Sequence, residues 1–286
     1  TPSTEVLETI AKHRPDDVYV EWSVNEKAAM ELAAGASYAG ARSMVTMKQV
    51  GLNVASDPLM SLEYVGIKGG MVILVADDPG PISSQTEQDT RHFSRFSKLP
   101  CFDPSSAQEA YEMIQEAFEY SEKYGTPVFL RPTTRVCHGY ASIMVKDETE
   151  YTHHQPEGFI KDSKRWVIFP RLSFMNHKKI EARNQELSDI FSSYEKNTIH
   201  PSCDAFKDSK KGIATGGISY TYTMETLKKT GMVKTLKIAT PHPFPEKLAV
   251  DFLSGLDEVL CLEELDPVIE RELIYICLLY TSPSPR

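Results

Sequence analysis

A glutamate, Glu26, lies near the start of a predicted helix, residues 23–42, that is built almost wholly of alanine, glycine and other small residues. A helix with so little bulk has few large side chains to bury, and we expect it to let another backbone approach closely. A carboxyl group at the mouth of such a helix can be held in a dry cleft, where desolvation favours its protonated form. An enzyme that donates a proton to a heterocycle at neutral pH needs such a group.

A second interpretation of Glu26 is purely structural. Ser23 and Glu26 have the spacing of a capping box, in which the serine caps the helix and the glutamate reaches back from the third helical position. This pattern is a common signature of helix starts. The two roles exclude each other only if Glu26 is exposed, so both interpretations stay open on the sequence.

Further candidate residues follow predicted strands. Gly51, Leu52 and Asn53 come soon after a buried strand, residues 43–47, and form a predicted turn, although most such turns have no further role. Residues 77–91 and 132–138 follow two more strands. Ligands of open parallel sheets bind beyond the carboxyl ends of the strands. Residues 83–91, the polar part of the segment 77–91, are therefore a candidate ligand loop by position and an ordinary surface loop by composition.

Composition and charge exclude some classes of function. The 286 residues carry a formal net charge of -9, and apolar residues make up 41% of them. This usage is typical of globular proteins, and the acidic balance argues against nucleic acid as a partner. The five cysteines are widely spaced and form no CxxC pair, so the sequence predicts no metal site. Unpaired cysteines of this kind predict a reducing, cytoplasmic location. Neither a membrane-spanning segment nor a signal peptide is predicted.

Strands and helices alternate along the chain, which predicts two doubly wound, mainly parallel α/β domains. In the first half, the predicted strands are 17–21, 43–47, 71–76 and 127–131, and the helices are 23–42 and 107–124. In the second half, residues 171–210 are predicted to be polar and helical, followed by strands 212–216, 233–238 and 258–262 and helices 220–229 and 245–256. The predicted units are a domain at 1–145, a linker at 146–165, a domain at 166–272 and a non-native tail at 273–286.

Seven segments of the chain carry a family resemblance: 19–29, 48–59, 75–80, 83–91, 124–128, 131–135 and 263–267. Together they resemble the alpha subunits of indolepyruvate:ferredoxin oxidoreductases, members of the thiamine-diphosphate-dependent 2-oxoacid:ferredoxin oxidoreductase family. The resemblance covers most of the chain up to residue 272 and is densest in the first half. It is much more specific than any single motif.

The resemblance implies roles for particular residues. The first domain is then similar to the pyrimidine-binding domain of thiamine diphosphate enzymes, and the second to the C-terminal domain of transketolase. The thiamine-activating acid falls on Glu26, and the turn beside the pyrimidine falls on Gly51, Leu52 and Asn53. An N-terminal cofactor-binding segment of the family falls on Thr1 and its neighbours. A carboxyl group that shares a proton with the pyrimidine ring would activate the cofactor for attack on a 2-oxo carbon.

The resemblance also implies cofactors and partners. Thiamine diphosphate with Mg²⁺ and iron–sulfur clusters are the implied cofactors, and coenzyme A is a co-substrate. A small 2-oxoacid, ferredoxin and a beta subunit are the implied partners, in a dimer of heterodimers. The magnesium motif and the cluster cysteines of the family are absent from this sequence. The chain is therefore expected to be a fragment truncated at both ends, and to be inactive alone.

Three departures bear on the substrate. Gln49 and Ile82 stand where the family is associated with histidine. Asp77 or Asp78 stands where the related pyruvate enzymes carry an arginine, which favours arylpyruvates such as indolepyruvate. Two alternatives stay open. One is a pyruvate or branched-chain 2-oxoacid:ferredoxin oxidoreductase, and the other is a non-catalytic α/β binding module in which Glu26 is only a capping residue.

Overall fold

Four parallel strands, in the order β1-β2-β4-β3, form the sheet of the first domain in the computed structural model, which describes residues 3–14, 16–151 and 155–281. Their bounds are β1 (Ser43–Lys48), β2 (Met71–Ala76), β3 (Cys101–Phe102) and β4 (Val128–Leu130). Every residue of β2 is buried, as expected for a central parallel strand covered on both faces. Because all four strands run the same way, their carboxyl ends meet at one edge of the sheet.

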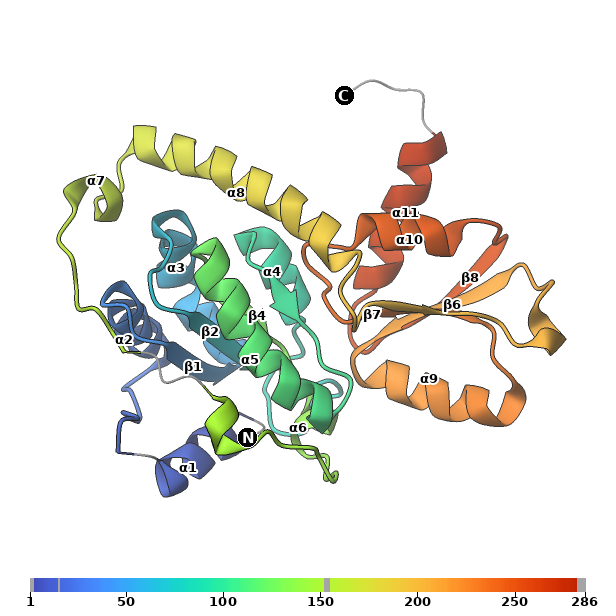
Figure 1. Cartoon of the computed structure of the whole chain (residues 1–286), viewed down its shortest axis with the longest axis horizontal. Helices are drawn as coiled ribbons and strands as arrows, with labels where there is room; N and C mark the ends of the chain where they lie inside the picture. The colour runs from blue at the N-terminus through green and yellow to red at the C-terminus, as the bar shows by residue number, and fades with distance from the viewer. Residues whose placement is uncertain (1–2, 15, 152–154, 282–286) are drawn as a thin grey trace.

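Helices cover both faces of this sheet (Figure 1). Their bounds are α1 (Thr4–His13), α2 (Glu26–Tyr38), α3 (Gln49–Val65), α4 (Thr90–Ser97), α5 (Ala107–Tyr124) and α6 (Thr134–Cys137). Met30, Leu52 and Leu59 bring α2 and α3 onto one face, against Ile73 of β2. The other face is covered by α5 through Met113 and Ala117, together with the end of a later helix, α8 (Pro170–Phe191). The first domain is thus a three-layer α/β unit.

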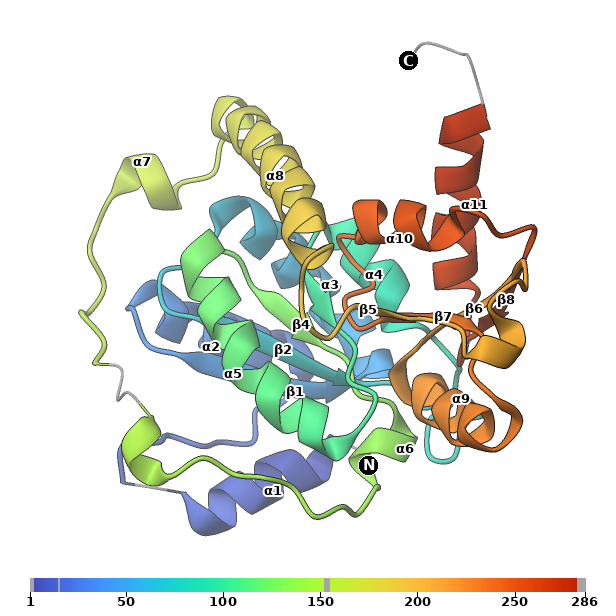
Figure 2. The same ribbon diagram turned by 45° about the vertical axis from the view of Figure 1, so that its right-hand side comes forward.

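The second domain is a smaller sheet in the order β5-β7-β6-β8, in which only β5 is antiparallel. Its elements are β5 (Thr198–His200), η2 (Asp204–Phe206), β6 (Lys211–Gly216), α9 (Gly217–Thr230), β7 (Lys234–Ile238), α10 (Glu246–Leu253), β8 (Glu258–Leu262) and α11 (Val268–Thr281). Helices α10 and α11 pack on one face of the sheet, and α9 lies on the other (Figure 2). The fold class predicted from the sequence is therefore confirmed.

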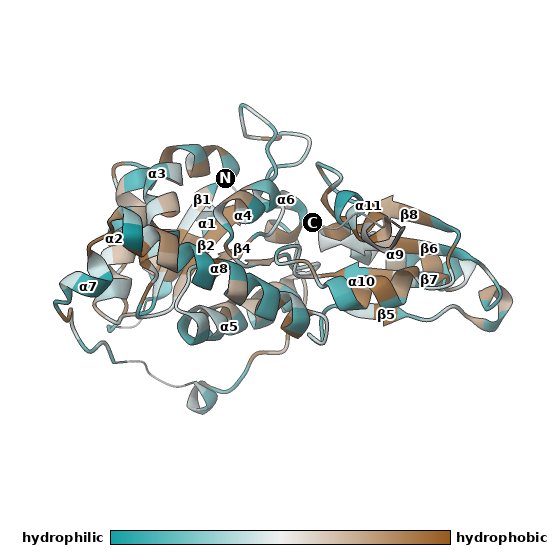
Figure 3. Cartoon of the chain, turned by 90° about the horizontal axis from the view of Figure 1, so that it is seen from above, coloured by the Kyte–Doolittle hydropathy of each residue, from teal (hydrophilic) through white to brown (hydrophobic). Residues whose placement is uncertain are grey.

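Helix α8 joins the two halves. It follows the predicted linker, which contains η1 (Glu148–Glu150) and α7 (Ser163–Trp166). Arg183 of α8 donates to Glu63 of α3 at 2.7 Å, and Ser188, further along the helix, donates to the backbone oxygen of Phe244 at 2.6 Å. The single helix therefore contacts both domains. In Figure 3 the ribbon of α8 is coloured mostly as hydrophilic, whereas β8 is coloured mainly as hydrophobic.

Some predicted elements are corrected. Residues 17–21 form no strand, because no strand of the described chain pairs with them and Tyr19 is 80% exposed. Gly51, Leu52 and Asn53 are not a turn but are the third to fifth residues of α3. The polar region 171–210 is helical only to Phe191 and then forms β5, which is too short to leave a clear pattern. Residues 273–281 continue helix α11, and Ile276 is buried in the core of the second domain, while the non-native origin of the tail stays a prediction.

Within the described ranges, the chain has no helix that combines the length and the apolar character needed to cross a membrane.

Candidate functional site

The open end of the sheet lies beside β1 and β2. Lys48 at the end of β1 pairs with Ala76 at the end of β2, and a further bridge joins Asp77 to Thr133 after β4. The residues that follow these strands therefore lie next to one another, as the rule for parallel sheets predicts. The other half of the edge, after β3 and β4, is covered by the second domain.

Glu26 is not a capping residue. The N-cap of α2 is Asn25, whose Oδ1 accepts a hydrogen bond from the backbone nitrogen of Ala28 at 2.9 Å. Glu26 is then the first helical residue, and Ser23 instead donates to Glu21 at 3.0 Å. The capping-box interpretation is therefore wrong. As an acidic residue in the first turn, Glu26 is favoured by the helix dipole, but it makes no capping hydrogen bond.

The side chain of Glu26 lies directly on Gly51. A Cβ atom built on Gly51 would be 2.6 Å from Cγ of Glu26 and 2.7 Å from its Oε1. Real Cβ atoms do not come this close to other heavy atoms, so a glycine is required here for Glu26 to keep its position. Glu26 is half-buried, and its carboxylate has no hydrogen bond or ion pair to any residue of the described chain. The carboxylate is therefore available to a ligand.

The other predicted cofactor-binding residues take different positions. Leu52 is fully buried in the core beneath α3, so it supports the site by packing rather than by exposure. Asn53 is exposed, and its Nδ2 donates to Oε1 of Gln88 at 3.0 Å. Thr1 lies outside the described residues. The structure thus brings Glu26 and Gly51 into contact and places Leu52 and Asn53 in the same helical turn as Gly51.

The loop between β2 and α4 is attached to the start of α3. Lys48 Nζ donates to the hydroxyls of Ser83 and Ser84 at 2.8 and 3.1 Å, and Gln49 Nε2 donates to the backbone oxygen of Thr86 at 3.2 Å. Asp78 holds the loop from the other side, because its Oδ2 accepts from the backbone nitrogens of Ser83 and Ser84. Residues 83–86 therefore form one wall of the open edge.

The carboxylate of Asp78 is strongly stabilised in its charged form. Desolvation acts to raise its pKa, but the hydrogen bonds from Ser83, Ser84 and Thr134 outweigh desolvation and hold the pKa well below its usual value. Asp78 is therefore an anion that fixes the loop, and it is poorly suited to donate a proton.

A buried ionic cluster that the sequence did not predict lies after β3 and β4. Arg131 is fully buried and donates to Asp77 at 2.7 Å and to Asp103 at 3.2 Å. Burial raises the pKa of Asp103 to about 6, although Arg131 and Arg91 act in the opposite direction. Asp103 also faces the second domain, because a Cβ atom on Gly217, where φ is +50°, would lie 3.2 Å from its Oδ1.

Arg91 connects this cluster to the second domain. Its guanidinium donates to Asp89 and to Glu263, each at 2.6 Å, and to the backbone oxygens of Glu264 and Asp266, each at 2.8 Å. Both Arg91 and Asp89 are buried. Burial acts to raise the pKa of Asp89, but Arg131 and Arg91 together lower it well below its usual value. The two domains are therefore held together by buried, paired charges.

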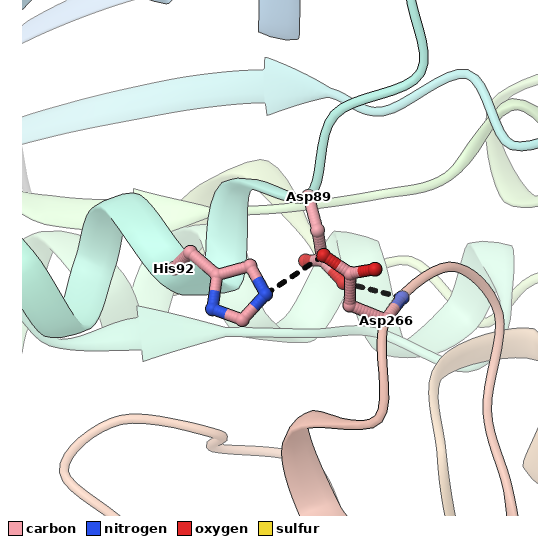
Figure 4. A group of neighbouring side chains, drawn as sticks. All are labelled: Asp89, His92 and Asp266. Carbon is pink, nitrogen blue, oxygen red and sulfur yellow. Dashed lines mark hydrogen bonds and ion pairs between the residues drawn. The ribbon is translucent and has the colours of Figure 1, made fainter.

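Asp89, His92 and Asp266 form the one group of described side chains with a metal-like arrangement, since their ligand atoms lie within 4.8 Å of one another (Figure 4). His92 Nε2 lies 2.8 Å from Oδ2 of Asp266. Both oxygens of Asp89, however, already accept hydrogen bonds from Arg91. A cation at this position would have to displace a guanidinium group, so we assign the group to the domain interface.

A hollow of about 940 Å³ lies elsewhere, between α3, α4 and the segment before α8. Its lining is largely apolar and includes Met60, Phe93, Phe96 and Trp166. None of Glu26, Gly51 and Asn53 lines it. The chemistry suggested by the sequence is thus at the carboxyl edge of the sheet and not in this groove.

Two solved structures share the arrangement of the two α/β domains found in this chain. The chain superposes over its whole length on 56% of a chain of the 2-oxoglutarate:ferredoxin oxidoreductase of Magnetococcus marinus, with a TM-score of 0.71 and 18% identity. It superposes on 78% of a chain of a split-gene transketolase, with a TM-score of 0.59 and 15% identity. The class is therefore that of α/β proteins that share their fold with 2-oxoacid oxidoreductases and transketolases.

Residues 1–202 match the family described as pyruvate flavodoxin/ferredoxin oxidoreductase, thiamine-diphosphate-binding. The chain belongs to this family, and the resemblance stated from the sequence is confirmed. Curated relatives include the indolepyruvate oxidoreductase subunits IorA of Methanothermobacter thermautotrophicus, 43% identical over 96% of this chain, and of Pyrococcus abyssi, 42% identical over 95%. The chain spans less than half the length of these relatives, 44% and 42% respectively.

Proposed function

We propose that this chain forms part of a thiamine-diphosphate-dependent enzyme that oxidatively decarboxylates arylpyruvates, with indolepyruvate as the substrate, to aryl-acetyl coenzyme A. Ferredoxin is the electron acceptor, and the reaction takes place in the cytoplasm. The observation that carries the proposal is the Glu26 carboxylate, which lies on Gly51 at the open edge and has no partner among the described residues. A carboxylate that makes no structural hydrogen bond is available for chemistry.

The residues of this chain fit a thiamine cofactor at one point above all. Bound thiamine diphosphate would supply the nucleophilic carbon and the electron sink of the decarboxylation. Glu26 would hold or share the proton of a ring nitrogen, which is general acid–base work suited to a half-buried carboxyl group. Gly51 keeps Glu26 in position, and the packed side chain of Leu52 fixes the helical turn beneath it. Asn53 and Thr1 remain predicted contacts of the cofactor.

Other parts of the enzyme belong, in this proposal, to the rest of a longer polypeptide and to its partners. These parts are the magnesium site for the diphosphate, the iron–sulfur clusters, a beta subunit and the second half of a dimer of heterodimers. The five cysteines of this chain are free thiols far apart in the sequence, and Cys101 is fully buried. We therefore propose that this chain is inactive by itself.

The substrate class rests on the relatives. Six curated relatives at 38–43% identity are named as indolepyruvate oxidoreductase subunits, whereas a ketoisovalerate oxidoreductase subunit is 24% identical. The higher identity favours arylpyruvates over branched-chain 2-oxoacids. Comparing the rates of the full-length enzyme on indolepyruvate, pyruvate and 2-oxoisovalerate separates these possibilities.

The decisive experiment compares Glu26→Gln with the wild type in the full-length enzyme and its partner subunit. Turnover of indolepyruvate with ferredoxin or a viologen dye should fall about 10²–10⁴-fold, because a neutral amide cannot share the proton. The melting temperature should fall by no more than a few degrees, since the carboxylate makes no structural hydrogen bond and only its favourable interaction with the helix dipole is lost. Glu31→Gln, at an exposed position of the same helix, is the matched control and should keep full activity. Wild-type turnover in Glu26→Gln would exclude the assigned proton transfer.

A further inference from the structure

We propose that Lys48 binds the carboxylate of the 2-oxoacid and so selects anionic substrates. This inference rests on the function proposed above and adds the residue that recognises the acid group. A 2-oxoacid keeps its carboxylate until the bond to it breaks, so the site needs a cation close to the group that activates the cofactor. Lys48 is placed to supply that charge.

Lys48 is the last residue of β1 and the N-cap of α3. Its ammonium group donates to two neutral hydroxyls, those of Ser83 and Ser84. No carboxylate of the described chain lies within ion-pair distance of it, and its side chain does not cap the helix. Gly51, on which Glu26 lies, is three residues further along the chain, near the start of α3. A positive charge without a carboxylate partner among the described residues thus comes from the same strand–helix junction as the glycine that contacts the predicted proton donor.

The other cations at this edge are already neutralised. Arg131 is bound by Asp77 and Asp103, and Arg91 is bound by Asp89 and Glu263. All of these side chains are buried, so a substrate could reach neither guanidinium without breaking a buried ion pair, which is strongly unfavourable. A carboxylate that enters the open edge therefore meets its free counter-charge at Lys48.

Neighbouring groups strengthen this position. The first backbone N–H groups of a helix lack partners within the helix and carry a partial positive charge, and Lys48 stands at that end of α3. Asp78, which holds the loop, accepts from Ser83 N, Ser84 N and Thr134, and these bonds occupy its oxygens. The loop is thus held so that its hydroxyls face the Lys48 ammonium.

A second observation marks the same place as incomplete without a ligand. Gln49 is 1% exposed, and its Oε1 has no hydrogen-bond partner among the described residues. Its Nε2 donates to Thr86, on the same loop that Lys48 contacts. Buried polar atoms are nearly always partnered, so the unpaired Gln49 acceptor, next in the chain to a lysine without a carboxylate partner, indicates a site where a hydrogen-bond donor of a ligand completes the contacts.

The test uses the full-length enzyme with its partner subunit and the variants Lys48→Met and Lys48→Arg. Lys48→Met keeps the length of the side chain and removes the charge. It should raise KM for indolepyruvate, and Ki for indole-3-propionate, by about 10- to 100-fold, the loss expected for one charge-assisted hydrogen bond. The uncharged indole-3-propionamide should inhibit both enzymes equally. Lys48→Arg should recover most of the affinity.

Lys27→Met is the matched control. Lys27 lies on the exposed surface of α2 and pairs with Asp57, so its replacement should leave all constants within about two-fold.

Two further constants test whether Lys48 binds the phosphate groups of thiamine diphosphate or coenzyme A in place of the substrate carboxylate. The Kd of thiamine diphosphate and the KM of coenzyme A should stay within two-fold in Lys48→Met. A change in either constant in place of the KM for indolepyruvate would assign Lys48 to a phosphate group and overturn the inference, as would an unchanged KM. A wild-type enzyme that converts no 2-oxoacid would instead overturn the proposed function itself.

Discussion

The Glu26 side chain and the backbone of Gly51 occupy adjoining space so tightly that a methyl group on Gly51 would lie 2.6 Å from Cγ of Glu26. The two residues come from different helices, α2 and α3, and are 25 positions apart in the sequence. The contact explains why the small residue at Gly51 matters: it sets the position of the one carboxylate to which we assign chemistry.

Replacing Gly51 by alanine should therefore reduce activity without unfolding the protein. The added methyl group displaces Glu26, and we expect turnover by the full-length enzyme to fall at least about 10-fold, because proton transfer depends on the position of the carboxyl group. Stability should change by no more than about 1 kcal/mol, since alanine favours a helix over glycine by roughly that amount. Activity assays combined with urea denaturation measure both effects.

Gly35→Ala is the control for this variant. Gly35 is also a helical glycine, in α2, but a Cβ atom there would meet no heavy atom within 4 Å. It should stabilise the protein by about 0.5–1 kcal/mol and leave turnover unchanged. Equal activities of the two variants would show that Glu26 does not depend on Gly51.

The sequence predicted the elements whose signals are local. Strands β2 and β8 and helix α5 have the predicted bounds, because a continuous apolar run, or an amphipathic period between Ser106 and Gly125, marks their ends. The start of α2 was placed wrongly, because Ser23 and Asn25 are both good N-caps and the spacing to Glu26 fits only the first. Only the three-dimensional contact of Asn25 with Ala28 decides between them.

The buried ionic cluster could not be found from the sequence. Asp77, Asp103 and Arg131 each follow a different strand, and each looks like an ordinary polar residue at a strand end. These three side chains come into contact because of the strand order β2-β4-β3, which could not be predicted from the sequence. The available signal was the rule that strand ends of a parallel sheet converge. It correctly placed residues 77–91 and 132–138 at one edge but did not say which side chains pair there.

The interface between the domains should be sensitive to the loss of Arg91. In Arg91→Met, the buried Glu263 side chain loses its ion pair and Asp89 keeps only the longer contact with Arg131 at 3.7 Å, and removing one partner of a buried pair costs about 3–5 kcal/mol. Arg95→Met is the control, because Arg95 is 57% exposed in its pair with Glu272 and the change should cost no more than about 1 kcal/mol. Urea denaturation of both variants measures the difference. Similar midpoints would mean that the Arg91 network does not stabilise the fold.

Acid should weaken the same interface through His242. The backbone oxygen of His242 accepts from Cys101 of β3 at 2.8 Å, so this histidine anchors the second domain on the first. Burial lowers the pKa of His242 to about 3, with Arg95, Lys98 and Arg183 acting in the same direction. The unfolded chain therefore binds a proton below pH 6.5 that the folded chain does not bind. Stability from this group is present above pH 6.5 and is lost as the pH falls towards 3, by about 1.4 kcal/mol per pH unit.

Denaturation at pH 7 and at pH 5 tests this dependence. The wild type should lose about 2 kcal/mol more than His242→Gln between the two values, because glutamine does not titrate. His177→Gln, which removes a ring that is 44% exposed, should behave as the wild type does. Parallel pH curves for the wild type and His242→Gln would contradict the assignment.

Asn53 has two possible roles that two variants separate. Its amide donates to Oε1 of Gln88 at 3.0 Å, so it could act only by holding the loop, or it could contact thiamine diphosphate as predicted. If it contacts the cofactor, Asn53→Ala should weaken the binding of thiamine diphosphate by about 2- to 12-fold, the effect of one net hydrogen bond, while Gln88→Ala changes the Kd by less than two-fold. Equal Kd values for the two variants would limit Asn53 to the loop contact. Because Asn53 is exposed, Gln88 is half-buried and their bond is on the surface, neither variant should lower the melting temperature by more than a degree or two.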